Sequence, residues 1–216
     1  MKIEIVVVDD HKIFRDGIRN LLDQQANMKV IGEAEDGRTA VDLIRKLSPQ
    51  VVIMDVTMPN LNGIDATRRI LEKNPAVKVI ALSMHAQRRL VQEMLKAGAS
   101  GYLLKECAFE ELVQAIHVVF EKNQIYLSPG ITQVVVHDYL QPAQKVELPD
   151  VSPLTPKERE ILQLIAEGKT NENVAETLDM SRRTVEKHRA RIMDKLNADS
   201  LADLIKYAIR EGLTRL

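Results

Sequence analysis

Short apolar runs alternate with longer amphipathic segments through the first 122 residues, and this alternation limits the possible folds more than any other feature. The runs are rich in β-branched residues and are too short to be buried helices. The longer segments repeat apolar residues at the spacing of a helix that buries one face. This pattern is typical of a parallel sheet covered by helices on both faces. We therefore expect a five-stranded, doubly wound α/β sheet. The expected strands are residues 3–8, 29–34, 51–54, 78–82 and 101–104.

A stretch of weak periodicity, punctuated by three prolines and ending just before a fourth, separates this part from the rest of the chain. We interpret residues 123–152 as a linker, although residues 131–140 could also form a helix. Residues 153–216 show no strand pattern but four helical segments. The chain is thus expected to have two domains, residues 1–122 and residues 153–216.

Composition excludes several classes of protein. No apolar run approaches the roughly 18 residues that cross a bilayer, and two aspartates follow the first apolar run before an export signal could be complete. The only cysteine, Cys107, allows neither an internal disulfide nor a structural zinc site. We therefore expect a cytoplasmic protein that does not bind a membrane. The formal net charge of -1 indicates neither a nucleic-acid coat nor an acidic tail.

Three aspartates are placed to meet at one edge of the expected sheet. Asp9 and Asp10 follow the first strand, and Asp55 ends the third. The carboxyl ends of parallel strands lie at the same edge, where doubly wound sheets bind ligands. Close carboxylates repel one another unless a cation lies between them, and oxygen ligands favour Mg²⁺ before Ca²⁺. The sequence therefore predicts a magnesium site.

A hydroxyl and an ammonium are expected at the same edge, because Ser83 ends the fourth strand and Lys105 the fifth. Both groups donate hydrogen bonds to anionic oxygens. Together with the aspartates they would form a site that accepts a phosphoryl group.

The motifs around these residues resemble the receiver domain of two-component signalling. They are VVVDDH at 6–11, MDVTMPNLNG at 54–63, ALS at 81–83 and GYLLK at 101–105, so the resemblance covers the whole N-terminal part. It implies a flavodoxin-like fold in which Asp55 accepts a phosphoryl group from a sensor histidine kinase. It also implies a set of ligands for Mg²⁺, namely Asp9, Asp10, Asp55 and the backbone carbonyl of Thr57.

The same resemblance implies a switch. Ser83 would move toward the acyl phosphate, Lys105 would bind a phosphoryl oxygen, and Tyr102 would swing inward behind the serine. A single local charge change would thus drive the transition.

Two further positions and one departure follow from the receiver pattern. Thr57 and His85 stand two residues beyond the phosphoacceptor and the serine, at positions that in this family tune hydrolysis of the phosphoryl group. Receivers commonly carry proline after the lysine, whereas here Glu106 follows Lys105, so a cis peptide at this point cannot be assumed.

The C-terminal part begins with a capping box, in which Thr155 and Pro156 precede Glu158. A short helix is expected at about residues 171–178, and Ser181 is expected to cap a third helix that runs to residue 196. A helix, a short turn and a second helix form the arrangement that places the second helix in a DNA major groove.

Positive charge concentrates on this third helix. Residues 181–196 contain six lysines and arginines but only two acids, Glu186 and Asp194. Val185, Ile192 and Leu196 share one apolar face, and polar residues fall mostly on the other. A solvated helix surface would give the same charge run, so the charge alone does not establish DNA binding.

Residues 154–209 resemble the four-helix LuxR-type output domain of the NarL/FixJ subfamily of response regulators. The resemblance implies that residues 181–196 are the recognition helix, with Glu186, Lys187 and Ala190 turned toward the bases. It implies pairing of two output domains on a palindromic site, for which the apolar stripe of residues 200–212 would serve, although packing within the domain explains that stripe nearly as well. The candidate phosphate contacts are Thr170, Asn171, Arg183, Thr184, Arg189 and Arg191.

Glu186 departs from this pattern, since relatives often carry a basic residue there. A glutamate accepts a hydrogen bond from cytosine N4 but repels phosphates. We therefore expect lower general affinity for DNA and greater specificity.

These features predict a cytoplasmic transcriptional regulator in which phosphorylation of Asp55 shifts a pre-existing equilibrium toward homodimers or a freed output domain that binds promoter DNA. It would not be an enzyme beyond its own phosphorylation and dephosphorylation. Two alternatives remain. In one, the N-terminal domain is a Mg²⁺-dependent phosphohydrolase, although Thr57 replaces the second acid of that motif; in the other, the receiver is inert and DNA binding is constitutive. The first, fourth and fifth receiver helices all remain possible dimer surfaces.

Overall fold

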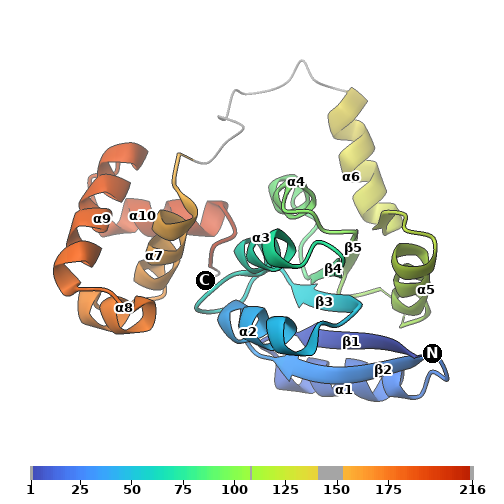
Figure 1. Ribbon diagram of the computed structural model, residues 1–216. Coiled ribbons are helices and arrows are strands. Elements are labelled where there is room, and N and C mark those ends of the chain that lie inside the picture. Colours follow the sequence, from blue (N-terminus) through green and yellow to red (C-terminus); the bar gives the residue numbers. More distant parts are fainter. Residues whose placement is uncertain (1, 108, 141–152, 215–216) are drawn as a thin grey trace. The chain divides into compact units, whose positions relative to one another are not determined.

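The computed structural model describes residues 2–107, 109–140 and 153–214. The chain forms two compact units: the N-terminal unit contains the sheet and helices α1–α6, and the C-terminal unit contains α7–α10 (Figure 1). Within the described ranges, no helix has both the length and the apolar character that crossing a bilayer requires.

Six parallel strands form the sheet of the N-terminal unit, in the order β2-β1-β3-β4-β5-β6. The predicted parallel α/β sheet is confirmed, but the predicted number of five strands is wrong. The sixth strand is only two residues long, so it carries no apolar run that the sequence could reveal. It is defined by its pairing with β5, where the Tyr126 N–H donates to the Ser100 carbonyl at 3.0 Å. The strands are β1 (Ile3–Val8), β2 (Met28–Ala34), β3 (Val51–Asp55), β4 (Lys78–Ser83), β5 (Gly101–Leu104) and β6 (Tyr126–Leu127).

Helices cover both faces of this sheet. Helices α1 and α5 lie on one face, and α2, α3 and α4 lie on the other (Figure 1). This is the doubly wound arrangement that the alternating sequence pattern indicates. The helices of the unit are α1 (Lys12–Asp23), α2 (Gly37–Leu47), α3 (Gly63–Lys73), α4 (Arg88–Lys96), α5 (Phe109–Glu121) and α6 (Pro129–Leu140).

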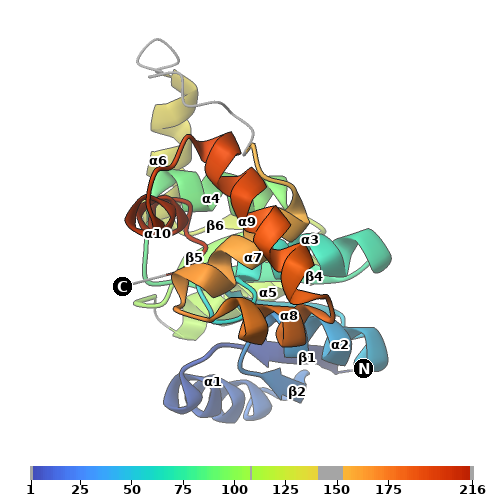
Figure 2. The ribbon, with the colours of Figure 1, turned by 90° about the vertical axis from the view of Figure 1, so that its left-hand side faces the viewer.

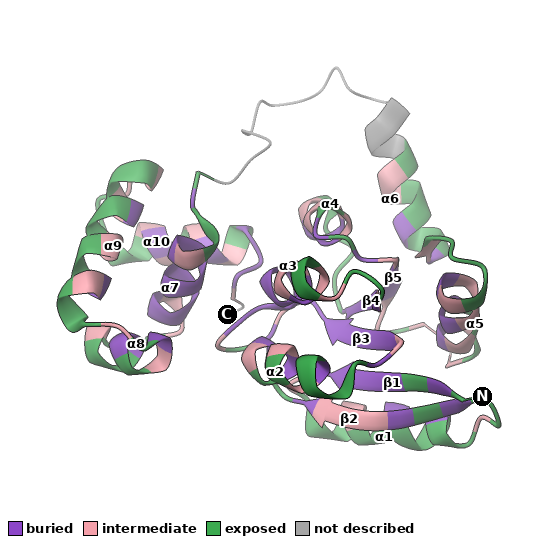
Figure 3. Cartoon of the chain, viewed as in Figure 1, coloured by how far each residue is buried: buried purple, intermediate pink, exposed green. Residues whose placement is uncertain are grey.

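The core lies between the sheet and its helices, and the central strands are almost wholly buried (Figure 3). Ile5 and Ile53 of the sheet pack with Leu22 of α1 and Ile116 of α5 in one apolar cluster. Burial on both faces explains why these strands read as continuous apolar runs rather than as alternating patterns. The packed strands therefore hold the residues at the carboxyl edge of the sheet in defined positions.

The loop after β3 is fixed by the start of α3. Asn62 caps this helix by accepting a hydrogen bond from the Asp65 N–H at 2.9 Å. The Gly63 N–H donates to the Val56 carbonyl at 2.9 Å, and a Cβ at Gly63 would lie 1.9 Å from the carbonyl oxygen of Asp55. Only glycine leaves room for this close approach, which holds the end of β3 in place.

Part of the stretch predicted to be a linker has regular structure. It contains β6, and the helix considered for residues 131–140 is present as α6. Ile131 of α6 is buried. The remainder of the predicted linker, residues 141–152, lies outside the described residues.

Four helices form the C-terminal unit, as predicted. The capping box at Thr155 and Glu158 is confirmed, and Ser181 caps α9 by accepting a hydrogen bond from the Thr184 N–H at 3.1 Å. Val185 and Ile192 of α9 are buried in the core that the four helices share. The helices are α7 (Pro156–Ala166), α8 (Asn171–Leu178), α9 (Arg182–Leu196) and α10 (Leu201–Arg210).

A polar contact joins the first turn of α7 to the last turn of α9. Lys195, near the end of α9, donates to Glu158 Oε2 at 2.6 Å, and the Thr155 N–H donates to the same oxygen at 2.8 Å. One carboxylate therefore caps α7 and also binds a side chain of α9.

Candidate functional site

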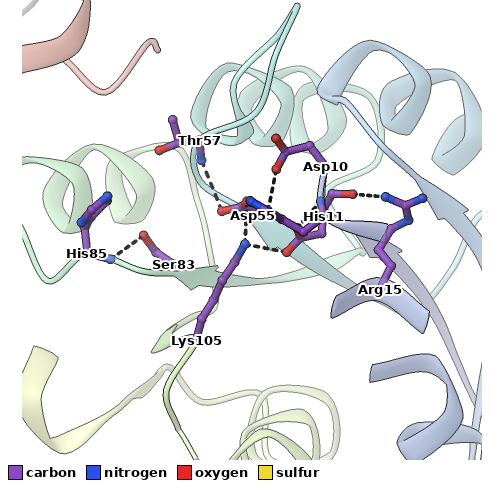
Figure 4. Close-up of polar contacts among 9 residues, drawn as sticks. Asp10, His11, Arg15, Asp55, Thr57, Ser83, His85 and Lys105 are labelled. Atoms are coloured by element: carbon purple, nitrogen blue, oxygen red, sulfur yellow. Dashed lines mark hydrogen bonds and ion pairs between the residues drawn. The ribbon is translucent and has the colours of Figure 1, made fainter. Parts of the chain in front are cut away.

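The structure brings the three predicted aspartates together at the carboxyl edge of the sheet. Asp9 and Asp55 are buried, and Asp10 is half-buried. One ligand atom each from Asp9, Asp10, His11 and Asp55 lies within 4.8 Å of the others. Figure 4 shows Asp10 and Asp55 converging from the ends of β1 and β3.

Lys105 lies within this cluster and pairs with two of its carboxylates. Its Nζ lies 2.7 Å from Asp9 Oδ2 and 2.7 Å from Asp55 Oδ2, and its side chain is only 5% exposed. The ammonium also lies 4.9 Å from the centre of the Phe14 ring. A buried cation that is held at two carboxylates is in position to bind further anionic oxygens.

Burial changes the acidity of the central carboxylate. Burial raises the pKa of Asp55 from 3.8 to about 6, the Asp9 carboxylate adds to this rise, and the Lys105 ammonium opposes it. A cation in the pocket would favour the charged form of Asp55.

This shift predicts how the free energy of unfolding depends on pH in a buffer that contains a chelator, so that no metal ion is bound. The pKa of Asp55 is higher in the folded protein than in the unfolded chain, so from pH 4 to pH 6 the folded state holds more protons and this group's contribution to stability falls. The loss is about 3 kcal/mol in total. We expect the stability of the Asp55→Asn variant, relative to wild type, to increase by about 2 kcal/mol between pH 4 and pH 6, because most of this loss falls in that range. Urea unfolding at several pH values measures the difference, and a constant difference would contradict the assignment.

Ser83 and Tyr102 lie beside the acidic cluster in a connected set of hydrogen bonds. The Ser83 hydroxyl oxygen accepts from the His85 N–H at 3.1 Å, and the Tyr102 hydroxyl donates to the His85 carbonyl at 2.9 Å. The Tyr102 ring is fully buried, and burial raises the pKa of its hydroxyl to about 12. The structure therefore describes the inward position of Tyr102.

The remaining predicted positions of the pocket lie at its rim. The Thr57 N–H is 3.4 Å from Asp55 Oδ1, and the His85 side chain is exposed. The described residues contain no cis peptide bond, so the Lys105–Glu106 bond is trans.

Two residues of the pocket were not predicted from the sequence. His11 Nδ1 lies 3.2 Å from Asp9 Oδ1 and 3.0 Å from Asp10 Oδ1, and Arg15 donates to the Asp9 carbonyl (Figure 4). His11 directly follows the aspartate pair, and Arg15 lies one helical turn after it. Their closeness to the motif is the signal that could have identified them.

The donor set of this cluster fits a hard divalent cation. Its carboxylate oxygens are the ligands that Mg²⁺ prefers, and Asp9 and Asp10 come from the same turn while Asp55 comes from the neighbouring strand. Such an ion would offset the repulsion between carboxylates that Lys105 offsets only in part.

The C-terminal unit presents the predicted helix-turn-helix. Helix α8 packs against α9, and the two are joined by the turn at residues 179–181. Figure 2 views this unit with α9 toward the reader. Its buried residues face the other helices, so the opposite side of α9 is open.

Most of the predicted DNA contacts lie on this open side or at the start of α8. Two of them also have a structural role, because Thr170 caps α8 and the Thr184 hydroxyl lies 2.8 Å from that of Ser181. Asn171, Thr184 and Arg189 are partly exposed. The exposed positions are Thr170, Arg183, Glu186, Lys187, Ala190 and Arg191.

Comparison with known proteins agrees with both units. Residues 5–117 match the response regulator receiver domain family, and residues 152–208 match the bacterial regulatory proteins of the luxR family. The chain is 35% identical over 228 residues to the transcriptional regulatory protein DegU of Brevibacillus brevis, a match that covers 100% of this chain and 96% of that protein.

Further similarities also span nearly the whole chain. It is 37% identical over 211 residues to the response regulator UvrY of Escherichia coli strain K12, covering 98% of this chain and 95% of that protein. The structure of a complex of the two-component response regulator RcsB with DNA is similar with a TM-score of 0.60 and 26% identity, covering 98% of this chain and 99% of that chain. The chain therefore belongs to the two-component response regulators of the NarL/FixJ family, with a receiver domain and a LuxR-type DNA-binding domain that regulates transcription.

Proposed function

We propose that this response regulator accepts one phosphoryl group on Asp55 from a sensor histidine kinase and that the phosphorylated chain binds double-stranded promoter DNA as a homodimer. The observation that carries the proposal is the position of the buried Asp55 carboxylate, 2.7 Å from the Lys105 ammonium and next to Asp9 and Asp10. The protein acts in the cytoplasm, and the only reactions it catalyses are its own phosphorylation and dephosphorylation.

The transfer is a displacement at phosphorus. A carboxylate oxygen of Asp55 forms an O–P bond while the P–N bond of the kinase phosphohistidine breaks. The electron pair of that bond stays on the imidazole nitrogen, which takes up a proton. Lys105 binds an oxygen of the transferred group, because its ammonium is already buried beside the acceptor carboxylate.

Asp9, Asp10, Asp55 and the backbone carbonyl of Thr57 are the residues that would hold Mg²⁺. When bound, the ion supplies positive charge that offsets the charge on the transferring oxygens. The convergence of the carboxylates within 4.8 Å supports this ligand set. Lys105 competes for two of the same carboxylates, so the pocket balances two kinds of cation.

The signal leaves the pocket through Ser83. Once Lys105 pairs with the phosphoryl group, the Ser83 hydroxyl turns toward the same group. This movement shifts the His85 backbone, because the His85 N–H donates to the Ser83 hydroxyl oxygen. The His85 carbonyl in turn accepts a hydrogen bond from the Tyr102 hydroxyl. Tyr102 is thereby held inward. Thr57 and His85 at the rim set how fast water removes the phosphoryl group.

Helix α9 is the DNA-reading element. Glu186, Lys187 and Ala190 face the bases. Arg183, Arg189 and Arg191 contact phosphates. Their exposure in the C-terminal unit supports these roles. The structure of RcsB with DNA supports the same use of this domain in the present chain.

Phosphoryl uptake by Asp55 tests the proposal. We expect the wild-type chain, incubated with acetyl phosphate and Mg²⁺, to gain the mass of one phosphoryl group. The Asp55→Asn variant should gain none, because its amide cannot act as the nucleophile. Intact mass spectrometry measures both, and a chelator added to the wild type tests whether Mg²⁺ is required. Uptake by the variant would place the acceptor elsewhere.

A second measurement, the release of inorganic phosphate from a small phosphoester, separates the receiver from a phosphohydrolase. A receiver stops at one phosphoryl group per chain, whereas a phosphohydrolase releases inorganic phosphate from a small phosphoester over many turnovers. Thr57, which stands where a phosphohydrolase would need its second acid, offers only its backbone N–H to Asp55 at 3.4 Å. We therefore expect no multiple turnover.

A further inference from the structure

Three charged side chains form an ion-pair cluster at the junction of α8 and α9. Arg182, the first residue of α9, donates through Nε to Glu186 Oε1 at 2.9 Å, and its Nη1 lies 2.5 Å from Glu172 Oε1 of α8. The side chains of Arg182, Glu186 and Glu172 are 63%, 47% and 53% exposed. The cluster therefore lies in solvent, at the end of α9 that the proposed function turns toward DNA.

Exposed ion pairs contribute little to the stability of a protein, so stability does not explain this cluster. Arg182 and Glu186 are one turn apart on the same face of α9. The planar guanidinium carries five N–H donors in fixed directions, so it can contact both carboxylates at once. Its rigid geometry also restricts the conformations of a carboxylate that it binds. The pair thus limits the conformations of Glu186 and offsets the charge that DNA phosphates would repel.

We propose that Arg182 is a positioning residue for base recognition: it holds the Glu186 carboxylate in place to accept a hydrogen bond from N4 of a cytosine, and Glu172 holds Arg182 against α8. A carboxylate in the major groove accepts from cytosine N4. This inference rests on the proposed function, because it requires α9 to enter the major groove. Arg182 then acts through Glu186 and is not a phosphate contact.

The next residue provides a matched control. Arg183 is also exposed, and no ion pair joins it to another residue in the described ranges. Arg182→Ala and Arg183→Ala remove the same charge from adjacent positions of α9. Loss of a phosphate contact weakens binding to all sequences alike, whereas loss of positioning changes the preference among bases. The two variants therefore distinguish the two roles.

The experiment uses the full-length chain, treated with acetyl phosphate and Mg²⁺ or left untreated, and a library of double-stranded DNA with a randomised 20-base-pair segment. Selection by the wild type gives an enriched sequence. Duplexes with each of the four base pairs at each of its positions are then used to measure Kd for the wild type and for Arg182→Ala, Arg183→Ala, Glu186→Gln and Glu172→Gln. Circular dichroism checks that each variant is folded.

We expect one position of each half-site at which the wild type prefers cytosine by about tenfold. Glu186→Gln should move the preference at this position toward adenine, with which glutamine pairs. Arg182→Ala should lower the preference for cytosine to about threefold, and Glu172→Gln should lower it less. Arg183→Ala should weaken binding to all four duplexes by the same factor. The double variant of Arg182 and Glu186 should lose no more preference than Glu186→Gln alone.

Two results would overturn the inference while leaving the proposed function intact. One is an unchanged base preference in Glu186→Gln at every position, which would mean that the carboxylate reads no base. The other is an equal effect of Arg182→Ala and Arg183→Ala on all four duplexes, which would make Arg182 a phosphate contact. If neither the treated nor the untreated wild type enriches any DNA sequence, the proposed function and this inference are both overturned.

Discussion

Replacing Lys105 with alanine is expected to slow phosphoryl uptake by Asp55 by at least about 100-fold while making the pocket bind Mg²⁺ more tightly. The ammonium is buried between Asp9 and Asp55, so in the wild type it both stabilises charge during transfer and competes with the metal ion for two carboxylates. Loss of a preorganised donor from a site shielded from water slows the transfer. Loss of a competing cation leaves more negative charge for Mg²⁺.

The rate of phosphoryl uptake should fall while the affinity for Mg²⁺ rises. Unfolding of the variant would lower both quantities, so the two explanations are distinguishable. Isothermal titration with Mg²⁺ measures the affinity, and the rate of mass gain with acetyl phosphate measures uptake. Lys122→Ala is the matched control, because this lysine is exposed just after the end of α5, and neither quantity should change in this variant. Wild-type uptake in the Lys105 variant would exclude a role for the ammonium in transfer.

Replacing Gly63 with alanine is expected to destabilise the N-terminal unit by roughly 3 kcal/mol and to suppress phosphoryl uptake. The added Cβ would lie 1.9 Å from the carbonyl oxygen of Asp55, and a backbone atom cannot move aside as the tip of a side chain can. The loop from Asp55 to Gly63 must shift, and the Gly63 N–H bond to Val56 is then lengthened. The acceptor carboxylate would move with it.

Gly17→Ala provides the comparison. A Cβ at Gly17 meets no atom within 4 Å, and the residue lies in the exposed side of α1, so the alanine should raise stability by up to about 1 kcal/mol. Urea unfolding of both variants measures the two shifts. Equal stability of Gly63→Ala and wild type would show that the close approach at Asp55 does not constrain the loop.

The sequence predicts the fold well where burial and capping leave a local signal. The strands that carry the pocket are almost wholly buried, so their apolar runs mark them, and the convergence of Asp9 and Asp55 follows from the parallel order of the strands. The helices of the C-terminal unit were predicted closely because Thr155 and Ser181 are strong caps.

Features that depend on contacts distant in sequence were not predictable in this way. Strand β6 has two residues and exists through its pairing with β5. The ion pair between Arg182 and Glu172 joins two different helices, so the periodicity of neither helix predicts it. The inward position of Tyr102 depends on the His85 carbonyl, which is set by the backbone of a loop and not by a residue type.

The central claim is that phosphorylation of Asp55 controls DNA binding, and the most direct test measures DNA affinity before and after phosphorylation. Kd for the selected duplex is determined for wild type and Asp55→Asn, each with and without acetyl phosphate and Mg²⁺. We predict that treatment tightens binding by the wild type by about tenfold and leaves the variant unchanged, in line with allosteric couplings of ordinary size. A wild-type chain that gains one phosphoryl group but binds DNA with unchanged affinity would contradict the account.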